Sequence, residues 1–571
     1  MREIKETILK KVLLLILSFC CFFASDITST DYGKIIFEDG CYIDNSVIDI
    51  DGNGENENMS QEANQIIVKT LFDYEPFYNQ KEVIAEDASY EEVEEYKTRY
   101  RANAKKYYST LNKELLEKAK LTNYEDVYVS KYAPQIEYSY TISEFNANKN
   151  KILTSLAKDK DVSSVYVSNA NIERVECLST HLKYIGEQEI YNTGKYTGKN
   201  VVVGILDFGL VDTTNPNFVN TEIKTFRQRL TDTVGEHATQ MACIIGGDGG
   251  LACEATILSA QLHGVMSNEV EWMIDNNVDV INMSYGNTLA DGTYGSESAY
   301  ADVMIKNYDI TICASVGNTG QYTDGYVSNP AMGYNVLSVG SCYTGGSHSS
   351  SSSYLVGQSA PPKPVVCVPG DAVRVPTYAL SISGTSVSCA IMTGSVAYLY
   401  EKTPSLKTDA DKVLALVTCC STISLFMLRD NGFDMLTGAG MFNFQNCLAS
   451  SFKCSRYSNT SGTIRSEFYG GSVNMQANDT LKVSIASLIN ATGSIINYSF
   501  TDYDIKIYDS AHNLVAIRAS SLSNVEILEF TATQAGKYYI YLYQASERIN
   551  ASDQICYAYR IYNESTKQII K

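Results

Sequence analysis

The stretch "VVVGILDFG", Val201 to Gly209, predicts a buried β-strand that ends at an acidic residue. Apolar runs of the same kind recur downstream, separated by helical segments, as "VDVINMSYG" (278–286), "ITICASVGN" (310–318) and "NVLSVGS" (335–341). Buried strands that alternate with helices indicate a mostly parallel sheet with helices on both faces. We therefore predict an α/β domain over residues 177–450.

The regions on either side of this domain have different patterns. Residues 26–176 begin with an acidic stretch, then show a helical pattern from about Ala88 to Leu121 and a strand–helix–strand pattern over 136–169, which predicts an α+β unit. Residues 455–571 contain strand patterns such as "TLKVSIAS" and "KYYIYLYQ", separated by Asn, Asp and Gly turns. This spacing is typical of an antiparallel β-sandwich.

Length and charge narrow the class of protein. A chain of 571 residues is expected to form two to four domains. Its 45 basic and 65 acidic side chains give a net charge of −20. This balance argues against a nucleic-acid-binding surface or one that binds an anionic membrane.

The N-terminal 25 residues resemble an export signal. Basic residues precede the apolar run "VLLLILSFCCFFA" (12–24), which is short for a membrane span and is followed at once by polar residues. We therefore expect a signal peptide over 1–25 and a secreted protein, with a lipid-anchored surface form as the less favoured alternative. Of the fifteen cysteines, the thirteen outside this segment lack CxxC spacing and are expected mostly to be small buried side chains rather than zinc ligands.

The segment "DIDGNG" (49–54) imitates the start of a calcium-binding loop. The twelfth position, where a glutamate is needed, is Ser60. We therefore expect a solvated acidic loop there. The sequence leaves room for a structural calcium ion but locates none, and we expect no metal in the chemistry.

A serine at the start of an apolar helix is the first candidate for chemistry. In "SGTSVSCAIMTGSVAYLY" (383–400), Gly384 permits a tight turn and Ser386 stands where free N–H groups and the helix dipole favour negative charge. A serine hydroxyl is a weak nucleophile. It needs a base, an acid that orients the base, and donors for the oxyanion.

Three other residues could complete such a site. His237, one of five histidines, opens "HATQMACIIGG", whose small residues allow close helix packing. Asp207 ends a buried strand, where α/β sheets build their sites, and Asn318 follows another buried strand with an amide that could donate to an oxyanion. Each residue taken alone also fits a structural role: a loop acid, a structural histidine, a turn asparagine or, for Ser386, a helix cap.

Their order along the chain adds a family resemblance. The motifs "GILDFG", "EHATQMA", "ASVGNTG" and "SGTSVS" resemble those of the subtilases, the subtilisin-like serine peptidases. The resemblance extends over about residues 180–450, through "YTGKNVVVGILDFG", "VDVINMSYG", "NPAMGYNVLSVGS", "KPVVCVPG" and "GAGMFNFQNCL". It implies that Asp207 is the orienting acid, His237 the general base, Ser386 the nucleophile and Asn318 the oxyanion donor.

The same resemblance places Ser284 and Gly286 on a strand that pairs with substrate backbone. The chain departs from the family pattern at Phe208, Ala238 and Ala390, where Ser or Thr, Gly and Pro are usual. These departures remove no catalytic group, but they could alter rate or geometry.

The flanking regions also resemble parts of secreted subtilases. The strand–helix–strand unit resembles an inhibitory prodomain that covers the active site until a cut, here expected near Glu176. The C-terminal strands resemble the jelly-roll, or pre-peptidase C-terminal, domain, whose role could be stabilisation or attachment to a cell-surface polymer.

Two functions follow as hypotheses. The first is a secreted serine endopeptidase, made as a zymogen, that cleaves protein or peptide substrates through an acyl-enzyme without a cofactor and has its own prodomain as an intramolecular inhibitor. The alternative is a catalytically weak binding or scaffold protein that acts through its C-terminal β domain.

Overall fold

The structure is a computed structural model. It describes residues 35–36, 42–44, 65–72, 88–119, 124–157, 161–169, 184–286, 292–321, 326–355, 363–375, 381–423, 432–458, 467–491, 498–521, 523–546 and 552–563, with isolated residues at 74, 77, 84, 121, 159, 182 and 378. The expected signal peptide, the "DIDGNG" loop and the expected cut near Glu176 lie outside these residues. The boundary at residue 176 therefore stays a prediction.

The chain packs into two compact units. The first contains residues 1–72, 119–127 and 137–170, and the second contains residues 73–118, 128–136 and 171–571. Part of the region expected before the α/β domain thus packs with that domain.

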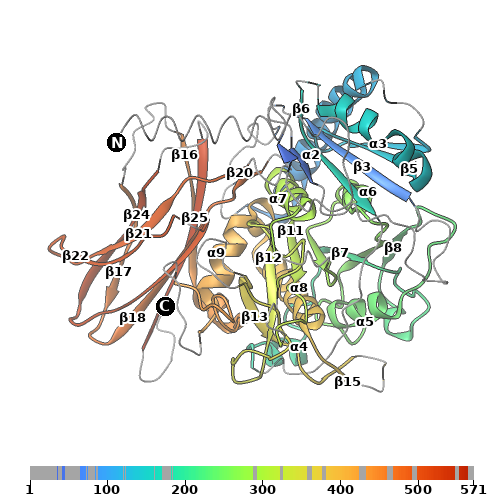
Figure 1. Cartoon of the computed structure of the whole chain (residues 1–571). Helices are drawn as coiled ribbons and strands as arrows, with labels where there is room; N and C mark the ends of the chain where they lie inside the picture. The colour runs from blue at the N-terminus through green and yellow to red at the C-terminus, as the bar shows by residue number, and fades with distance from the viewer. Residues whose placement is uncertain are drawn as a thin grey trace, which may run out of the picture. The chain divides into compact units, whose positions relative to one another are not determined.

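A seven-stranded sheet forms the centre of the second unit (Figure 1). Its strands are β7 (Val202–Asp207), β8 (Ile223–Phe226), β9 (Thr256–Gln261), β10 (Val280–Met283), β11 (Thr311–Ser315), β12 (Leu337–Cys342) and β13 (Val366–Pro369). They lie in the order β13-β12-β11-β10-β7-β9-β8, and every pair is parallel. The prediction of a parallel α/β sheet is confirmed.

Successive residues of a strand contribute alternately to two separate hydrophobic cores. Ile205 belongs to the core formed with α5 (Glu236–Ile245), α8 (Thr385–Lys402) and α9 (Ala410–Cys420). The next residue, Leu206, belongs to the core formed with α6 (Ser267–Asp275) and α7 (Ser296–Tyr308). Because successive side chains of a strand point to opposite faces, helices cover both faces of the sheet.

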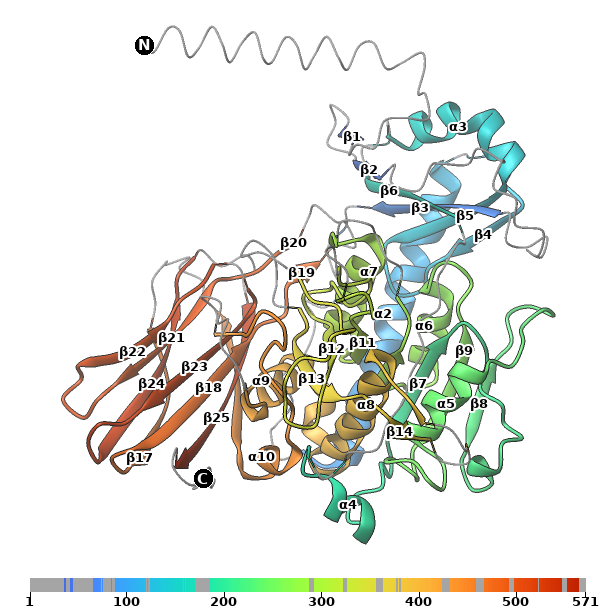
Figure 2. The same cartoon turned by 60° about the horizontal axis from the view of Figure 1, so that its bottom comes forward.

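The long helix α2 (Tyr90–Ala119) contributes to the second of these cores. It lies close to the range predicted from the sequence. Tyr96, Tyr100, Ala104 and Tyr108 recur at helical spacing, are buried, and belong to the same hydrophobic cluster as residues of α6 and α7. In Figure 2, α2 runs beside the elements of the α/β domain.

The first unit contains the predicted strand–helix–strand pattern. Its parts are β3 (Gln65–Phe72), most of β5 (Gln135–Thr141), α3 (Ile142–Ala157) and β6 (Val162–Asn169), with β3 placed between β5 and β6 in the sheet. The helix of this pattern, α3, begins at Ile142, directly after β5. Thr141 accepts a hydrogen bond from the backbone N–H of Glu144 (3.2 Å), which starts the helix there.

The C-terminal region is an antiparallel sandwich of two four-stranded sheets, as predicted. One sheet has the order β16 (Ser451–Ser458), β25 (Ser552–Asn563), β18 (Asp479–Ala486), β23 (Val525–Thr531), and the other β17 (Glu467–Met475), β24 (Gly536–Gln544), β21 (Tyr503–Tyr508), β22 (Leu514–Arg518). Counted along these eight strands, the orders are 1-8-3-6 and 2-7-4-5, which is jelly-roll topology.

The sandwich is joined to the α/β domain through α9. The Arg560 guanidinium donates to the Cys419 carbonyl (2.8 Å), and the Lys482 ammonium donates to the Ser421 carbonyl (2.8 Å). Of the cysteines in the described part of the chain, nine are free and mostly buried, and Cys556 is in a disulfide. In the same part, no helix is long and apolar enough to cross a bilayer.

Glu526 in β23 makes the stability of the sandwich depend on pH. Burial, followed by the charges of Asp504 and Asp502, raises the pKa of Glu526 from 4.5 to about 9. Between these two values the carboxyl group ionises in the unfolded chain but stays protonated in the folded one, so a rise in pH favours unfolding. The free energy of unfolding should therefore fall by up to about 1.4 kcal/mol per pH unit as pH rises from 4.5 towards 9.

We predict that Glu526→Gln flattens this decline, so that the variant gains stability relative to wild type as pH rises. Denaturant unfolding at about pH 5 and about pH 8.5 measures the effect. Glu189→Gln is the control, because that side chain is exposed at the surface. An equal difference from wild type at both pH values would show that Glu526 is not the titrating group.

Candidate active site

The candidate residues lie where three neighbouring strands end. Asp207 is the last residue of β7, Ser284 follows β10 and Asn318 lies three residues after β11. Because the sheet order is β11-β10-β7 and the strands are parallel, their carboxyl ends meet at one edge of the sheet.

Asp207 and His237 form a hydrogen-bonded pair. His237 Nδ1 lies 2.7 Å from Asp207 Oδ2, and Asp207 Oδ1 accepts from the Phe208 N–H at 2.8 Å. Asp207 is 1% exposed, so its charge is shielded from water. This geometry fixes the imidazole in the tautomer that carries its proton on Nδ1.

A close approach of two glycines brings this pair together. The backbone after β7 bonds to the segment before α5, through the Leu210 N–H to the Thr233 carbonyl and the Gly235 N–H to the Leu210 carbonyl, both 2.8 Å. A Cβ on Gly209 would lie 2.6 Å from the Cα of Gly235. Only glycine at these positions allows the two segments to approach this closely.

Ser386 is the second residue of α8 and is fully buried. Its Oγ donates to the Ser284 carbonyl (3.1 Å), while its own carbonyl accepts from Ser284 Oγ (2.8 Å). Gly384 precedes the helix with φ 144°, a conformation that favours glycine, as the sequence predicted.

Asn318 is oriented by Thr385, a contact that sequence reasoning missed. Asn318 Oδ1 accepts from the Thr385 N–H (2.9 Å) and from its hydroxyl (3.0 Å). Because Thr385 occupies the amide oxygen of Asn318, the Nδ2 group is the part of the amide that is left to donate to a ligand. The tripeptide "GTS" was the only sequence signal for this contact.

The three residues that depart from the family pattern are packed against other parts of the domain. The Phe208 ring meets Tyr285 edge-on at 5.6 Å between ring centroids, and Ala238 and Ala390 are fully buried in the hydrophobic core. Their side chains are apolar and take no part in the hydrogen bond between Asp207 and His237.

Ser284 and Gly286, expected to bind substrate backbone, lie in the buried stretch that follows β10. Ser284 is bonded to Ser386 through two hydrogen bonds. A Cβ on Gly286 would clash with Ser328 Oγ, so packing alone requires glycine there. A substrate role for these two residues stays a prediction.

A second imidazole–carboxylate group bonds to the loop before α5 and was not predicted. His263 Nε2 lies 2.8 Å from Asp232 Oδ1, and Nδ1 lies 3.2 Å from Glu269 Oε1. Asp232 Oδ2 in turn accepts from the N–H groups of Gln228 (2.8 Å) and Arg229 (3.2 Å). These hydrogen bonds therefore hold the loop that precedes α5, the helix that carries His237. Both nitrogens of His263 are engaged by carboxylates.

No cluster of three or more histidine, cysteine, aspartate or glutamate side chains within the described ranges is arranged to hold a metal ion. The expectation that the chemistry needs no metal stays a prediction.

A parallel sheet in this order, an aspartate–histidine pair at its edge and a serine at the start of a buried helix define the subtilisin-like class of α/β protein. Residues 198–440 match the family model described as the subtilase family. Over these residues the chain is similar to this family of serine peptidases, and the resemblance noted in the sequence is confirmed.

Individual relatives are similar over part of the chain. Subtilisin NAT of Bacillus subtilis subsp. natto is 26% identical over 300 residues, covering 48% of this chain and 74% of the relative. A subtilisin of Bacillus pumilus is 28% identical over 239 residues, covering 37% and 80%. A solved structure of the patellamide maturation protease PatA superposes with a TM-score of 0.38 and 20% identity, covering 44% of this chain and 96% of that one.

We predict that Gly209→Ala lowers the free energy of unfolding by about 1–3 kcal/mol, because the new methyl group meets backbone atoms that cannot move aside easily. It should also weaken the contact between His237 and Asp207. Denaturant unfolding measures the first effect, and the low-field proton resonance of His237 Nδ1–H measures the second. Gly345→Ala is the control, because a Cβ there meets nothing within 4 Å. Equal behaviour of the two variants would refute the role assigned to Gly209.

Proposed function

We propose that the protein is a secreted serine endopeptidase, made as a zymogen, that hydrolyses protein or peptide substrates through an acyl-enzyme. The observation that carries this proposal is the 2.7 Å contact between Asp207 and His237. Ser386 is hydrogen-bonded to Ser284 at the same edge of the sheet. The subtilase domain supports the same reaction class.

The proposed reaction uses the residues in the following roles. Ser386 Oγ leaves its bond to the Ser284 carbonyl and attacks the substrate carbonyl carbon, while His237 Nε2 takes its proton. Asp207 keeps the other imidazole nitrogen protonated and stabilises the imidazolium that forms. His237 then gives the proton to the leaving amine. Water hydrolyses the acyl-enzyme by the same steps, with His237 again as base.

The oxyanion would be stabilised by two donors. The first is the Nδ2 group of Asn318, which Thr385 orients by holding the amide oxygen. The second is the backbone N–H of Ser386 in the first turn of α8, where N–H groups have no partner within the helix. Donors that are fixed before the reaction act more strongly than water, which must reorganise.

Export and a zymogen form are supported by separate features. The basic and apolar residues at 1–25 favour export, and the disulfide at Cys556 suits an oxidising compartment. The sheet and helix of the first packing unit match the strand–helix–strand pattern expected of an inhibitory prodomain.

A second candidate function is binding without efficient hydrolysis. Aromatic side chains on β17 and β24 favour it, because the Tyr469 ring is 55% exposed and contacts Tyr541 (5.6 Å) and Tyr539 (6.4 Å). A surface row of tyrosines could attach the jelly-roll domain to a cell-surface polymer. Labelling with a serine-directed probe separates the two candidates.

We predict that a fluorophosphonate probe labels the wild-type protein and that Ser386→Ala abolishes labelling, because the probe requires an activated serine. Intact mass measures the adduct. Ser388→Ala, on the same helix and also buried, is the matched control and should still be labelled. Folded wild-type protein that takes up no probe would favour the binding function instead.

We also predict that Asn318→Ala lowers kcat by about 10²–10³-fold and leaves KM nearly unchanged, the loss found for the equivalent donor in subtilisin. Steady-state kinetics on a peptide substrate measures both constants. An unchanged kcat would remove Asn318 from the oxyanion site.

A further inference from the structure

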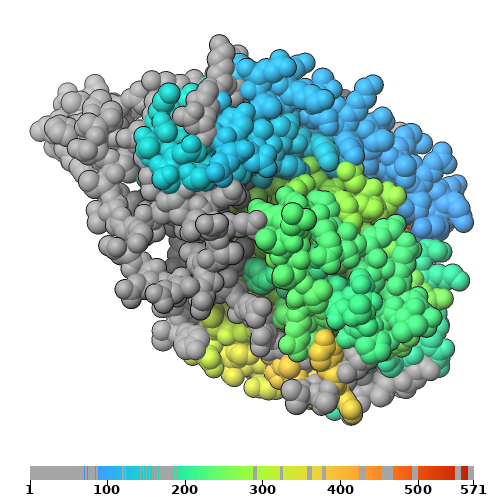
Figure 3. Space-filling view, turned by 90° about the vertical axis from the view of Figure 1, so that its right-hand side faces the viewer, coloured from blue at the N-terminus to red at the C-terminus, as the bar shows by residue number. Residues whose placement is uncertain are grey.

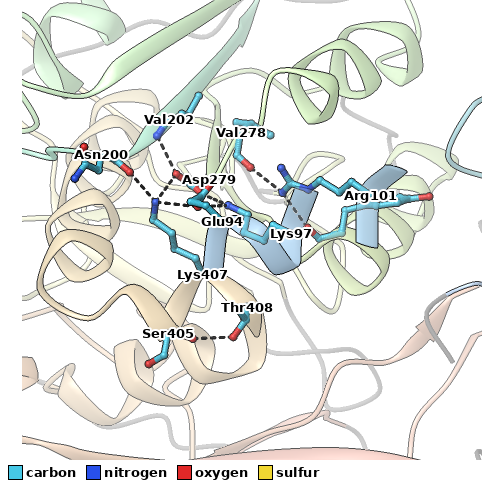
Figure 4. A network of polar contacts seen from close by, with 11 residues as sticks. Glu94, Lys97, Arg101, Asn200, Val202, Val278, Asp279, Ser405, Lys407 and Thr408 are labelled. Atoms are coloured by element: carbon cyan, nitrogen blue, oxygen red, sulfur yellow. Dashed lines mark hydrogen bonds and ion pairs between the residues drawn. The ribbon is translucent and has the colours of Figure 1, made fainter. Parts of the chain in front are cut away.

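The buried carboxylate of Asp279 is the centre of an ionic cluster at the end of β10 opposite to Ser284 (Figure 4). Asp279 is 1% exposed and immediately precedes that strand. Its Oδ2 accepts from the Lys407 ammonium and from the Val202 N–H, both at 2.9 Å, and its Oδ1 pairs with Lys97. Glu94 lies beside both lysines, at 3.3 Å from Lys97 and 3.6 Å from Lys407.

Two of the buried cations belong to α2. Lys97 is 1% exposed and Arg101, one turn later, is 3% exposed. The Arg101 guanidinium donates to the carbonyls of Val278 (2.9 Å) and Tyr308 (3.0 Å). In the space-filling view of Figure 3, the blue atoms of α2 lie against green atoms of the α/β domain.

A second segment, residues 128–136, binds to α6 through hydrogen bonds to three of its polar residues. Ser130 Oγ and the Lys131 N–H donate to the two oxygens of Glu271 (2.5 and 3.0 Å). The Tyr132 hydroxyl donates to Asp275 (2.6 Å), and the side chain of Gln135 donates to Ser267 Oγ (2.9 Å). Residues 128–136 therefore pack on α6, and α2 packs on the layer formed by α6 and α7.

The cluster also supports the strands that carry the site. The Asp279 backbone donates to the Val202 carbonyl (2.9 Å) and its carbonyl accepts from the Thr311 N–H (3.0 Å), which joins the starts of β7, β10 and β11. Burial alone would raise the pKa of Asp279, but Lys407 and Lys97 outweigh it and lower the pKa to about 2. Loss of one cation would leave a buried charge poorly compensated.

We propose that residues 73–118 and 128–136 are a permanent part of the catalytic unit rather than a detachable prodomain, and that a cut near residue 176 gives a two-chain enzyme. Only the position of the cut rests on the proposed function. The docking surface for the N-terminal chain is made by Asp279, Lys407 and the α6 residues Glu271 and Asp275. Asp279 pairs with Lys97 of α2, and Glu271 and Asp275 accept hydrogen bonds from residues 130–132. The carbonyls of Val278 and Tyr308 extend the surface by accepting from Arg101.

The test uses the full chain with Ser386→Ala and an inserted cleavage site for a specific protease between residues 171 and 181. The cut protein is run on a size-exclusion column in about 1 M NaCl. We expect both fragments to elute together at the position of the uncut 63.0 kDa chain, because buried pairs are screened little by salt. Separation of the folded fragments would overturn the proposal. The outcome does not depend on peptidase activity.

Two lysines of α2 provide a matched comparison. Lys97 is 1% exposed and Lys105 is 40% exposed, and each pairs with an aspartate of the α/β domain. Lys97→Met should raise the dissociation constant of the cut chain by about 100-fold or more, whereas Lys105→Met should change it by less than about 5-fold. Equal effects of the two substitutions would contradict the role of the buried cluster.

A second variant keeps the test decisive if Lys97→Met does not fold, as judged by melting of the uncut chain. Ser130→Ala combined with Tyr132→Phe removes hydrogen bonds to Glu271 and Asp275 without removing a charge. We expect about 10-fold faster dissociation of the fragments. Unchanged dissociation would show that residues 128–136 do not hold the N-terminal chain.

Discussion

The carboxylate of Asp279 is buried, and a buried charge must be matched by opposite charge and hydrogen bonds. Its partners come from three distant parts of the chain: α2, the start of β7 and the turn that contains Lys407. The need to satisfy this one group therefore fixes where α2 lies against the sheet. It also fixes the starts of the strands whose far ends carry Asp207, Ser284 and Asn318.

Such a cluster contributes more to a unique arrangement than to net stability. Two lysines and an aspartate lose most of their hydration on burial, and their attraction repays only part of that cost. The apolar stripe of α2 supplies the driving force, since its tyrosines join the core formed by α6 and α7. The charges then select one register of the helix, because a shift by one residue would bury Lys97 without its partner.

The sequence predicted those features that depend on local pattern. Apolar runs revealed the strands of the parallel sheet, and the end of "VVVGILD" placed Asp207 at the sheet edge, where the structure pairs it with His237. The packing of α2 could not be predicted, because Lys97 and Arg101 look like ordinary polar residues of an exposed helix face and the partner of Lys97 lies 182 positions away. The contact between Thr385 and Asn318 and the group around His263 were missed for the same reason. Each joins a loop to a helix that is distant in the sequence or has no pattern in common with it.

The strand order of the jelly-roll domain has a consequence for the timing of folding. Strand β25 is the last of the eight to be synthesised, yet it lies between β16 and β18 and is hydrogen-bonded to both. That sheet cannot close on the ribosome before β25 has emerged. Because α9 packs on β18 and β25, the sheet that covers α9 is completed only when β25 is added. The sandwich of the nascent chain thus remains incompletely folded until β25 has been synthesised.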